Sequence, residues 1–361
     1  MAMAIGFPFL RRFLHSAYRV HREPAIPPDP LILSYFVTFR CNLHCSYCDY
    51  VTNRFASSFP EVKTEKAIEI LRICRKGIPS VAFSGGEPLV REDIVEIVQE
   101  ARKLGYRPIS LFTNGLELHR KEELLKDLDY LQISMDSVDE DTQDDLRQRE
   151  GLGARLKDIV RHYARLQREV GFRMNINCVL TPKNVSRVQE LMEFALDAGV
   201  RFSCSPMLDE KGHAHPELYS LENRIAYQKA IESIIAFKRK TGNVIDIEPY
   251  LWHVSHFQPG PCFPTLSPRV YPDGLLRLPC AVYTNATPNV LELGCWENVH
   301  QMLKKSMMPC PEPCLLPCYL ETSLLVKHPW EILPELRPFK TGLFRRFATL
   351  PGKRDSVGVW P

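Results

Sequence analysis

The sequence predicts an α/β protein with a parallel sheet, and two observations lead to this prediction. Apolar, strand-like runs recur between residues 31 and 205, and stretches with helical periodicity separate them. An alternation of strands and helices implies that successive strands pair in parallel. The chain of 361 residues, of which 45% are hydrophobic, is long enough for one large α/β domain and a smaller second one.

The expected elements follow one another without an internal repeat or a low-complexity tract. Strands are expected at 31–39, 79–83, 108–112, 129–134, 172–179 and 200–205. Helices are expected at Thr64–Lys76, Arg91–Leu104, Ala154–Val170 and Val185–Ala198. This order gives six strands, fewer than the eight of a closed parallel barrel.

An amphipathic basic helix is expected in an N-terminal arm of residues 1–30. Its apolar face consists of Ile5, Phe9, Leu10, Phe13, Leu14, Ala17 and Val20, and its basic face of Arg11, Arg12, His15 and Arg19. Such a helix is suited to an anionic membrane surface, so residues 1–22 are a candidate for peripheral membrane contact. The C-terminal run 343–347 has a similar character. The alternative is an arm packed on the folded domain or on a partner subunit, which Pro8 and the net charge of only +3 favour.

Three cysteines follow the first expected strand at a spacing of three residues and then two. They are Cys41, Cys45 and Cys48, and the aromatic residue Tyr47 precedes the last of them. A four-iron cluster needs four ligands, so a three-cysteine loop leaves one iron open to an exogenous molecule. A zinc site usually closes with a fourth residue, and a zinc knuckle or a group of buried thiols is the alternative interpretation.

The second expected strand ends in a glycine pair and a carboxylate. The run is Gly85, Gly86, Glu87 and Pro88, directly after an apolar stretch. Glycines at such a position let the backbone come close to a ligand, and the Glu87 carboxylate is suited to an ammonium group.

The three-cysteine spacing, followed by this Gly-Gly-Glu-Pro turn, resembles the signature of the radical S-adenosylmethionine (SAM) enzymes. The resemblance implies a partial, TIM-like (β/α)6 barrel rather than a closed one. It also implies a [4Fe–4S] cluster whose open iron chelates the amino and carboxylate groups of SAM. One electron, from a donor such as flavodoxin or ferredoxin, then cleaves the sulfonium and releases a 5′-deoxyadenosyl radical.

Several later strand ends match the same family, and the resemblance implies a set of SAM contacts. The set is Tyr47, Gly85, Gly86, Glu87, Pro88, Thr113, Asn114, Ser134, Asp136, Arg147 and Asn177. Ser134 and Asp136 are expected near the ribose and methionine of SAM, and Arg147 is expected to pair with its carboxylate, a bidentate role suited to guanidinium. The alternatives are a solvated Arg147 and an Asn177 that only satisfies a strand edge.

A second group of cysteines lies in the C-terminal third. Cys262 precedes a predicted hairpin, Arg269–Cys280, whose turn is Asp273-Gly274, and the run 310–318 carries three more. This order resembles the auxiliary-cluster extensions called SPASM and twitch domains. It implies one auxiliary [4Fe–4S] cluster with ligands drawn from Cys262, Cys280, Cys310, Cys314 and Cys318. The late group departs from the SPASM spacing, so a second auxiliary cluster is not expected, and a structural zinc is the alternative occupant.

Four further cysteines receive different interpretations. Cys74 and Cys178 are expected to be buried packing residues, and Cys295 is left out of the ligand set. Cys204 ends the sixth expected strand, so a hydrogen-atom donor at the barrel mouth is the alternative to packing there.

Cysteine usage and charge also bear on compartment and partners. Twelve cysteines would suggest disulfides in a secreted protein, but here they cluster, and Arg11 and Arg12 follow the N-terminal apolar residues, unlike the order in a signal peptide. We therefore expect a reducing cytoplasm, with any membrane contact on the cytoplasmic face. No apolar run approaches the roughly 20 residues that span a bilayer. Basic residues do not cluster with aromatic platforms, so no nucleic-acid partner is expected.

Together these interpretations divide the chain into an arm (1–30), a partial barrel (31–245), an auxiliary-cluster domain (246–330) and a basic tail (331–361). The predicted function is radical SAM chemistry on an unidentified lipid or isoprenoid, peptide or small metabolite. The competing prediction is a non-catalytic iron–sulfur or zinc protein that serves as a membrane-associated scaffold or electron carrier.

Overall fold

Six parallel strands form an open barrel in the computed structural model, which describes residues 6–48, 60–306, 310 and 312–336. The strands are β1 (Ile32–Thr38), β2 (Ser80–Gly85), β3 (Ile109–Thr113), β4 (Tyr130–Ser134), β5 (Arg173–Leu180) and β6 (Arg201–Pro206). Each lies within two residues of its predicted start, and the sheet is not closed. The predicted fold class, a partial barrel with parallel strands, is therefore confirmed.

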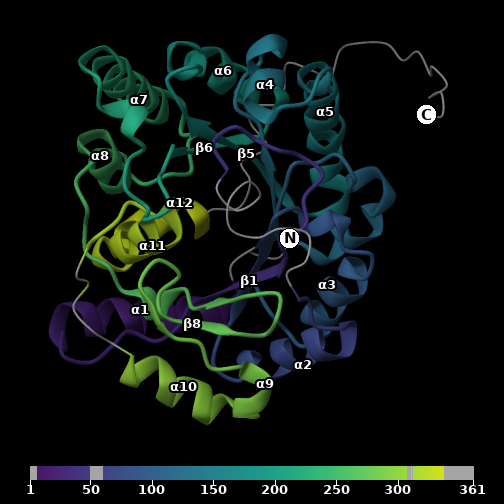
Figure 1. The fold of residues 1–361 in the computed structure, drawn as a ribbon, viewed down its shortest axis with the longest axis vertical. Helices are drawn as coiled ribbons and strands as arrows, with labels where there is room; N and C mark the ends of the chain where they lie inside the picture. The colour runs from purple at the N-terminus through teal and green to yellow at the C-terminus, as the bar shows by residue number, and fades with distance from the viewer. Residues whose placement is uncertain (1–5, 49–59, 307–309, 311, 337–361) are drawn as a thin grey trace.

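Helices cover the outer face of these strands, as the arc at the right and top of Figure 1 shows. They are α2 (Thr64–Arg75), α3 (Ile94–Lys103), α4 (Glu140–Arg147), α5 (Leu152–Val170) and α6 (Val188–Ala198). Two further helices follow β6, namely α7 (Leu221–Thr241) and α8 (Glu248–His256). The predicted helix Arg91–Leu104 begins three residues later than expected, because Arg91 has an extended backbone (φ −77°, ψ 122°) where the short 3-10 turn Pro88–Val90 ends.

The two faces of the sheet differ because side chains alternate along a strand. Toward the helices lie Leu33, Val81, Leu111, Leu131, Ile176 and Phe202, all in the main hydrophobic core. The opposite face carries a hydrogen-bonded polar row: the Asn175 amide donates to Gln132 Oε1 at 3.0 Å and to Ser203 Oγ at 3.1 Å. The inner face of the barrel is thus polar over β4, β5 and β6, where a polar ligand is tolerated.

The C-terminal hairpin extends the barrel sheet rather than standing apart from it. Strand β7 (Arg269–Val270) pairs in parallel with β1, and β8 (Leu276–Pro279) pairs with β7 in antiparallel register. Strand β9 (Thr284–Ala286) completes one sheet of order β6-β5-β4-β3-β2-β1-β7-β8-β9. The predicted division at residue 245 therefore does not coincide with a break in the sheet.

The helices of the C-terminal part are α9 (Val290–Leu293), α10 (Trp296–Lys305), α11 (Pro317–Lys327) and α12 (Leu333–Leu336). Helices α9 and α10 pack against α2 outside the strands, whereas α11 packs against α8 (Figure 1). The predicted basic run 343–347 lies outside the described residues.

The N-terminal arm forms helix α1 (Phe7–Arg22), which packs against α11. Phe9, Phe13 and Ala17 enter a small core with Leu31, Leu266, Val326 and Ile332. The predicted apolar face is split as a result: Leu14 is 53% exposed, and Phe7 and Tyr18 outside that face are 75% and 56% exposed. Ile5 lies outside the described residues. Across the residues that can be described, no helix is both long and apolar enough to cross a membrane.

Candidate functional site

The loop that carries Cys41, Cys45 and Cys48 leaves the carboxyl end of β1 and is held by its neighbours. The Ser46 N–H donates to the carbonyl of Leu146 in α4 at 2.9 Å. On the other side, the Asn114 amide after β3 donates to Asn42 Oδ1 at 2.7 Å. The loop is therefore fixed between helix α4 and the end of β3.

Two of the three sulfur atoms of this loop accept hydrogen bonds from nitrogen donors. The Leu43 N–H approaches Cys41 Sγ at 3.4 Å, and Arg147 Nη1 approaches Cys45 Sγ at 3.7 Å. Burial raises the pKa of the Cys41 thiol to about 12, and the nearby Glu87, Cys45 and Cys48 act in the same direction. Such a pKa disfavours a bare thiolate, and a bound metal ion deprotonates a coordinating thiol.

The donor set of this loop fits an iron–sulfur cluster. The structure contains no disulfide among the twelve cysteines, all of which it describes. Three thiols on one short loop with N–H donors to sulfur are what a cluster with one open iron needs. Within the described ranges, no three Cys, His, Asp or Glu side chains are already gathered into a closed metal site, so the ligand assignment stays a prediction.

Gly85 and Gly86 bring the end of β2 against the start of the cysteine loop. A Cβ on Gly86 would overlap the backbone oxygens of Arg40 and Phe39, and one on Gly85 would overlap that of Thr38. Gly85 also has a φ of 149°, which favours glycine. Both glycines were predicted to let the backbone come close to a ligand. In the structure they let the end of β2 come close to the protein's own backbone at residues 38–40.

Glu87 is buried behind this turn, and the protein satisfies both of its oxygens. Oε1 accepts from the Thr113 hydroxyl at 2.7 Å and from the Leu89 N–H at 2.9 Å, while Oε2 accepts from the Asn114 N–H at 2.6 Å. Burial raises the pKa of Glu87 to about 7, although these hydrogen bonds act to lower it. Pro88 opens the short 3-10 turn that follows. The predicted SAM residues Glu87, Thr113 and Asn114 therefore form one hydrogen-bonded unit.

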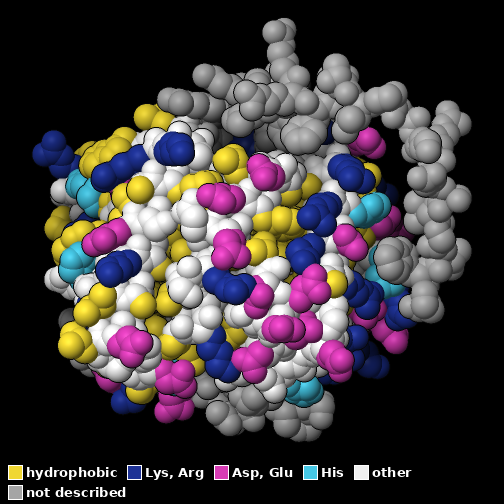
Figure 2. Space-filling model, turned by 90° about the horizontal axis from the view of Figure 1, so that it is seen from above, with side chains coloured by type: hydrophobic (Ala, Val, Ile, Leu, Met, Phe, Trp, Pro, Cys, Tyr) yellow, Lys and Arg dark blue, Asp and Glu magenta, His cyan; other side chains and the backbone are white. Residues whose placement is uncertain are grey.

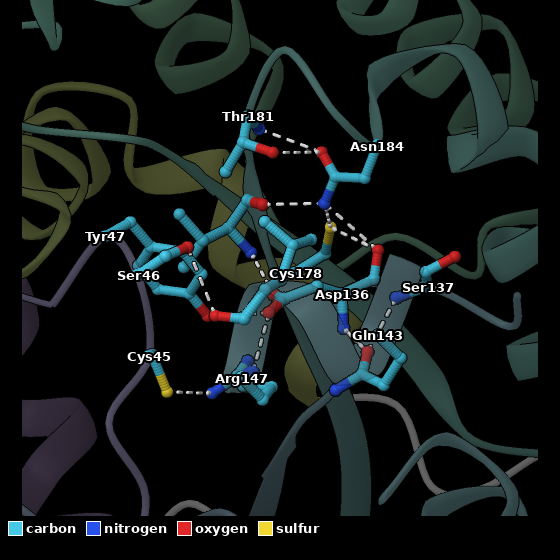
Figure 3. Close-up of polar contacts among 12 residues, drawn as sticks. Cys45, Ser46, Tyr47, Asp136, Ser137, Gln143, Arg147, Cys178, Thr181 and Asn184 are labelled. Carbon is cyan, nitrogen blue, oxygen red and sulfur yellow. Dashed lines mark hydrogen bonds and ion pairs between the residues drawn. The ribbon is translucent and has the colours of Figure 1, made fainter. Parts of the chain in front are cut away.

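Asp136 lies at the centre of a second unit beside the cysteine loop (Figure 3). Its side chain is fully buried; Oδ2 accepts from the Tyr47 hydroxyl at 2.6 Å and lies 2.6 Å from Arg147 Nε, and Oδ1 accepts from the Val179 N–H at 2.9 Å. Arg147 also lies over the Tyr47 ring, 5.5 Å from its centroid. The structure thus brings Tyr47, Asp136 and Arg147 together.

Arg147 keeps part of its guanidinium unused. Burial acts to lower its pKa, but Asp136, Tyr47 and Cys45 raise it well above the usual value, so the side chain is a permanent cation. Nη2 is buried and has no hydrogen-bond partner among the described residues. The carboxylate that Arg147 meets here is that of Asp136, and its predicted contact with SAM remains a prediction.

Ser134 and Asn177 lie opposite each other in the register of β4 and β5. Both are half-buried, and Asn177 Oδ1 accepts from the Ser203 hydroxyl at 3.1 Å. They belong to the polar inner face, two strand positions from the Asp136 unit.

Two amides that position Asp136 were not predicted from the sequence. Gln143 Oε1 accepts from the backbone N–H groups of Asp136 and Ser137 at 2.8 and 2.9 Å. The Asn184 amide donates to the carbonyls of Asp136 and Val179 at 3.0 and 2.9 Å (Figure 3). Neither residue belongs to a recognisable sequence motif. Both stand out only because they are buried, and the sequence alone does not reveal their burial.

The five C-terminal cysteines converge from three segments. Cys262 lies before β7, Cys280 directly follows β8, and Cys310, Cys314 and Cys318 lie before and at the start of α11. Burial is the main cause of the raised pKa of Cys262, and the other four thiols are near enough to raise it further. Sulfur again accepts from nitrogen: the Tyr283 N–H approaches Cys280 Sγ at 3.2 Å, and Arg269 Nη2 approaches Cys318 Sγ at 2.9 Å. This donor set also fits an iron–sulfur cluster.

Cys204 belongs to the helix-facing core, not to the barrel mouth. It is 2% exposed, and its N–H donates to Asp246 Oδ2 at 2.8 Å. Because side chains alternate on β6, Ser203 and Ser205 take the inward positions. The alternative of a hydrogen-atom donor at Cys204 is therefore wrong, while Cys74 and Cys178 are buried as expected.

Comparisons with known proteins concern the family and the fold. Residues 35–195 match the model of the Radical SAM superfamily. A probable GTP 3′,8-cyclase from Methanothermobacter marburgensis is 37% identical over 125 residues, which cover 34% of this chain and 39% of that protein. The chain thus matches well under half the length of this curated relative.

Solved structures share the fold at low identity. SuiB from Streptococcus suis gives a TM-score of 0.60 at 19% identity, covering 76% of this chain and 67% of its own. The protein anSMEcpe with bound AdoMet gives a TM-score of 0.55 at 22% identity, covering 78% of this chain and 84% of its own.

Proposed function

We propose that this protein is a radical SAM enzyme that reductively cleaves SAM and uses the resulting radical on a substrate, because residues 35–195 match the model of the Radical SAM superfamily. The observation that carries the proposal is the cysteine loop, whose Cys41 and Cys45 thiols accept N–H donors and which hydrogen bonds fix to the end of β3 and to α4. Cys41, Cys45 and Cys48 would hold a [4Fe–4S] cluster. When bound, that cluster supplies the electron that breaks the sulfonium bond.

The residues around the loop would bind SAM through complementary charge. Arg147 offers a buried, permanent cation with an unused Nη2, which suits a carboxylate. Glu87 is an acceptor held at the opposite side of the loop, and binding of an ammonium group would favour its ionised form. Ser134, Asn177 and the polar inner face would accept the ribose and the substrate.

We propose further that the C-terminal thiols hold one auxiliary [4Fe–4S] cluster. Five cysteines compete for four places, and Cys310 is the exposed one while Cys262, Cys280, Cys314 and Cys318 are buried or half-buried. We therefore assign the four less exposed cysteines as ligands. The iron content of Cys310→Ala should match that of the unmodified protein, whereas Cys314→Ala should lose up to one cluster. Equal losses in the two variants would contradict the assignment.

The substrate class is proposed from three candidates: a lipid or isoprenoid, a peptide, or a small metabolite. The related cyclase is named for GTP, and a SuiB structure contains a precursor peptide, so relatives of this fold differ in what they bind. The electron donor is proposed to be a flavodoxin or ferredoxin.

The test uses the anaerobically reconstituted protein with SAM and a strong reductant. Soluble and lipid extracts of the deuterium-grown host are supplied separately, and mass spectrometry follows deuterium in 5′-deoxyadenosine. Label from the lipid extract identifies a lipid substrate, and label from the soluble extract a peptide or metabolite. The Cys41→Ala/Cys45→Ala/Cys48→Ala variant is the matched control and should give none.

The absence of 5′-deoxyadenosine with either extract would contradict the proposal. SAM binding without cleavage would instead favour the competing function, a non-catalytic metalloprotein that serves as a scaffold or electron carrier.

A further inference from the structure

Arg269 places a buried positive charge on one sulfur of the C-terminal cysteine group. The residue lies on β7, is 4% exposed, and its Nη2 lies 2.9 Å from Cys318 Sγ. A hydrogen bond from a charged donor is about twice as strong as a neutral one. This contact therefore differs from the backbone N–H that approaches Cys280.

Aromatic rings hold the Arg269 guanidinium in this position. Its Cζ lies 4.6 Å from the ring centroid of Phe36 on β1 and 5.5 Å from that of Tyr319 on α11. The Tyr319 hydroxyl in turn accepts from the Ala281 N–H, next to Cys280, at 3.0 Å. The guanidinium is thus fixed between the barrel sheet and the helix that carries Cys318.

The neighbouring strand offers a matched cation in a different environment. Arg277 on β8 pairs with Arg269 in the antiparallel register. Its guanidinium lies instead over the Tyr271 ring, 4.2 Å from the centroid. Of these two arginines on adjacent strands, Arg269 contacts a sulfur and Arg277 contacts a tyrosine ring. Arg277 is therefore a control for the loss of a nearby positive charge.

The positive charge of Arg269 would affect the reduction potential of a cluster bound at Cys318. A [4Fe–4S] centre with four thiolate ligands is anionic, and reduction adds a further negative charge. A buried cation and a hydrogen bond to a ligand sulfur stabilise the reduced form more than the oxidised form. The reduction potential therefore rises.

We propose that Arg269 raises the reduction potential of an auxiliary cluster that has Cys318 as a ligand. The inference rests on the proposed function, because it needs the auxiliary cluster. A raised potential suits a cluster that accepts one electron from a substrate radical, which on loss of that electron and a proton becomes a closed-shell product. Arg269 is then a positioning and tuning residue, not a catalytic one.

The experiment measures the midpoint potential of the auxiliary cluster alone. The full chain with Cys41→Ala/Cys45→Ala/Cys48→Ala is reconstituted anaerobically, and a redox titration is followed by electron paramagnetic resonance. Arg269→Gln should lower the equilibrium constant for one-electron reduction at least about tenfold, equivalent to about 59 mV. Arg269→Lys should restore part of this loss, and Arg277→Gln should change the constant by less than about threefold, since its charge has no sulfur contact to lose.

The outcomes separate the two levels of the proposal. A background variant that binds no iron would overturn the auxiliary cluster, and this inference with it. A bound cluster whose potential is the same in Arg269→Gln as in the background would overturn the inference alone. Loss of the cluster in both Arg269→Gln and Arg269→Lys would assign Arg269 a structural role and would also overturn it.

Discussion

The two cysteine groups of this protein are held in different ways. The first places three thiols on one loop, which hydrogen bonds fix to Asn114 and Leu146 at the ends of neighbouring elements. The second collects thiols from three segments that meet only because β7 joins β1 and α11 packs beside them. The first group is therefore visible in the local sequence, whereas the second depends on tertiary structure.

The charges beside the two groups also differ. At the first group, Glu87 is close enough to Cys41 to raise the pKa of its thiol, and the Arg147 cation that approaches Cys45 Sγ at 3.7 Å is paired with the Asp136 carboxylate at 2.6 Å. At the second group, the Arg269 guanidinium lies closer, 2.9 Å from Cys318 Sγ. A nearby carboxylate disfavours reduction of an anionic cluster and a nearby cation favours it. We therefore expect the first cluster to have the lower reduction potential, as a donor of an electron to SAM requires.

The largest loss in the free energy of unfolding is expected from Asp136→Asn, which changes only the surroundings of the first cysteine group. The substitution leaves the buried Arg147 cation without its carboxylate, which costs about 3–5 kcal/mol in the free energy of unfolding. Chemical denaturation measures this loss, and the variant should lose the first cluster while it keeps the second. Asp145→Asn, which breaks the half-exposed pair with Lys183, is the control and should cost about 1 kcal/mol or less. Equal losses in the two variants would contradict the central position of Asp136.

A pH dependence distinguishes the carboxylates of the two regions. The pKa of buried Glu87 is raised to about 7, so its contribution to stability is complete below its ordinary value and is lost as the pH rises through 7. At roughly 1.4 kcal/mol per pKa unit, the loss is about 3 kcal/mol. Glu312, beside the second group, is half-buried, and a hydrogen bond from Tyr283 lowers its pKa, so its contribution to stability is lost as the pH falls. Unfolding curves between pH 4.5 and 8 should show the Glu87 slope, and Glu87→Gln should remove it; the same slope in that variant would refute the assignment.

Glycine substitutions compare how rigid the two regions are. A Cβ on Gly86 would meet the backbone of Arg40, which cannot give way, and we expect Gly86→Ala to cost about 3 kcal/mol. A Cβ on Gly260, near Cys262, would lie 2.7 Å from Leu320 Cδ1, the end of a flexible side chain, so Gly260→Ala should cost about 1 kcal/mol. Thermal unfolding of the two variants checks the order, and a larger loss for Gly260→Ala would reverse the comparison.

The smallest effect concerns helix α1, which packs beside the second region through α11. Because Phe9, Phe13 and Ala17 are buried, any membrane contact of α1 must use its exposed residues Phe7, Leu14 and Tyr18. We expect Phe7→Ser/Leu14→Ser/Tyr18→Ser to weaken co-sedimentation with anionic vesicles about threefold, since each lost apolar contact contributes little. Val170→Ser, at an exposed apolar site on α5, is the control. Unchanged co-sedimentation of the triple variant would show that α1 is not a membrane anchor.

Local patterns in the sequence were sufficient to predict the strands of the barrel. Strands such as β5 carry alternating or continuous apolar residues bounded by polar turns, and period and length alone placed them within two residues of the structure. Likewise, Glu87, Thr113 and Asn114 follow strand ends, and parallel strands bring such ends to one edge.

Long-range contacts lay beyond such patterns. The pairing of β7 with β1 joins residues more than two hundred positions apart, so nothing local indicates that the hairpin extends the barrel sheet. Gln143 and Asn184 act through buried amides on the backbone around Asp136, and Arg269 on β7 contacts a sulfur on helix α11. The sequence also could not show which face of the amphipathic helix α1 is buried, because that face is set by the packing of α1 against α11.

The most direct test of the central claim is the yield of 5′-deoxyadenosine from SAM. The anaerobically reconstituted protein and its Cys41→Ala/Cys45→Ala/Cys48→Ala variant are each incubated with SAM and a strong reductant, and the nucleoside is quantified by mass spectrometry. We expect 5′-deoxyadenosine from the unmodified protein and none from the variant, even though we expect the variant to keep iron at the second cysteine group. Equal yields from both, or no 5′-deoxyadenosine from either, would contradict the central claim.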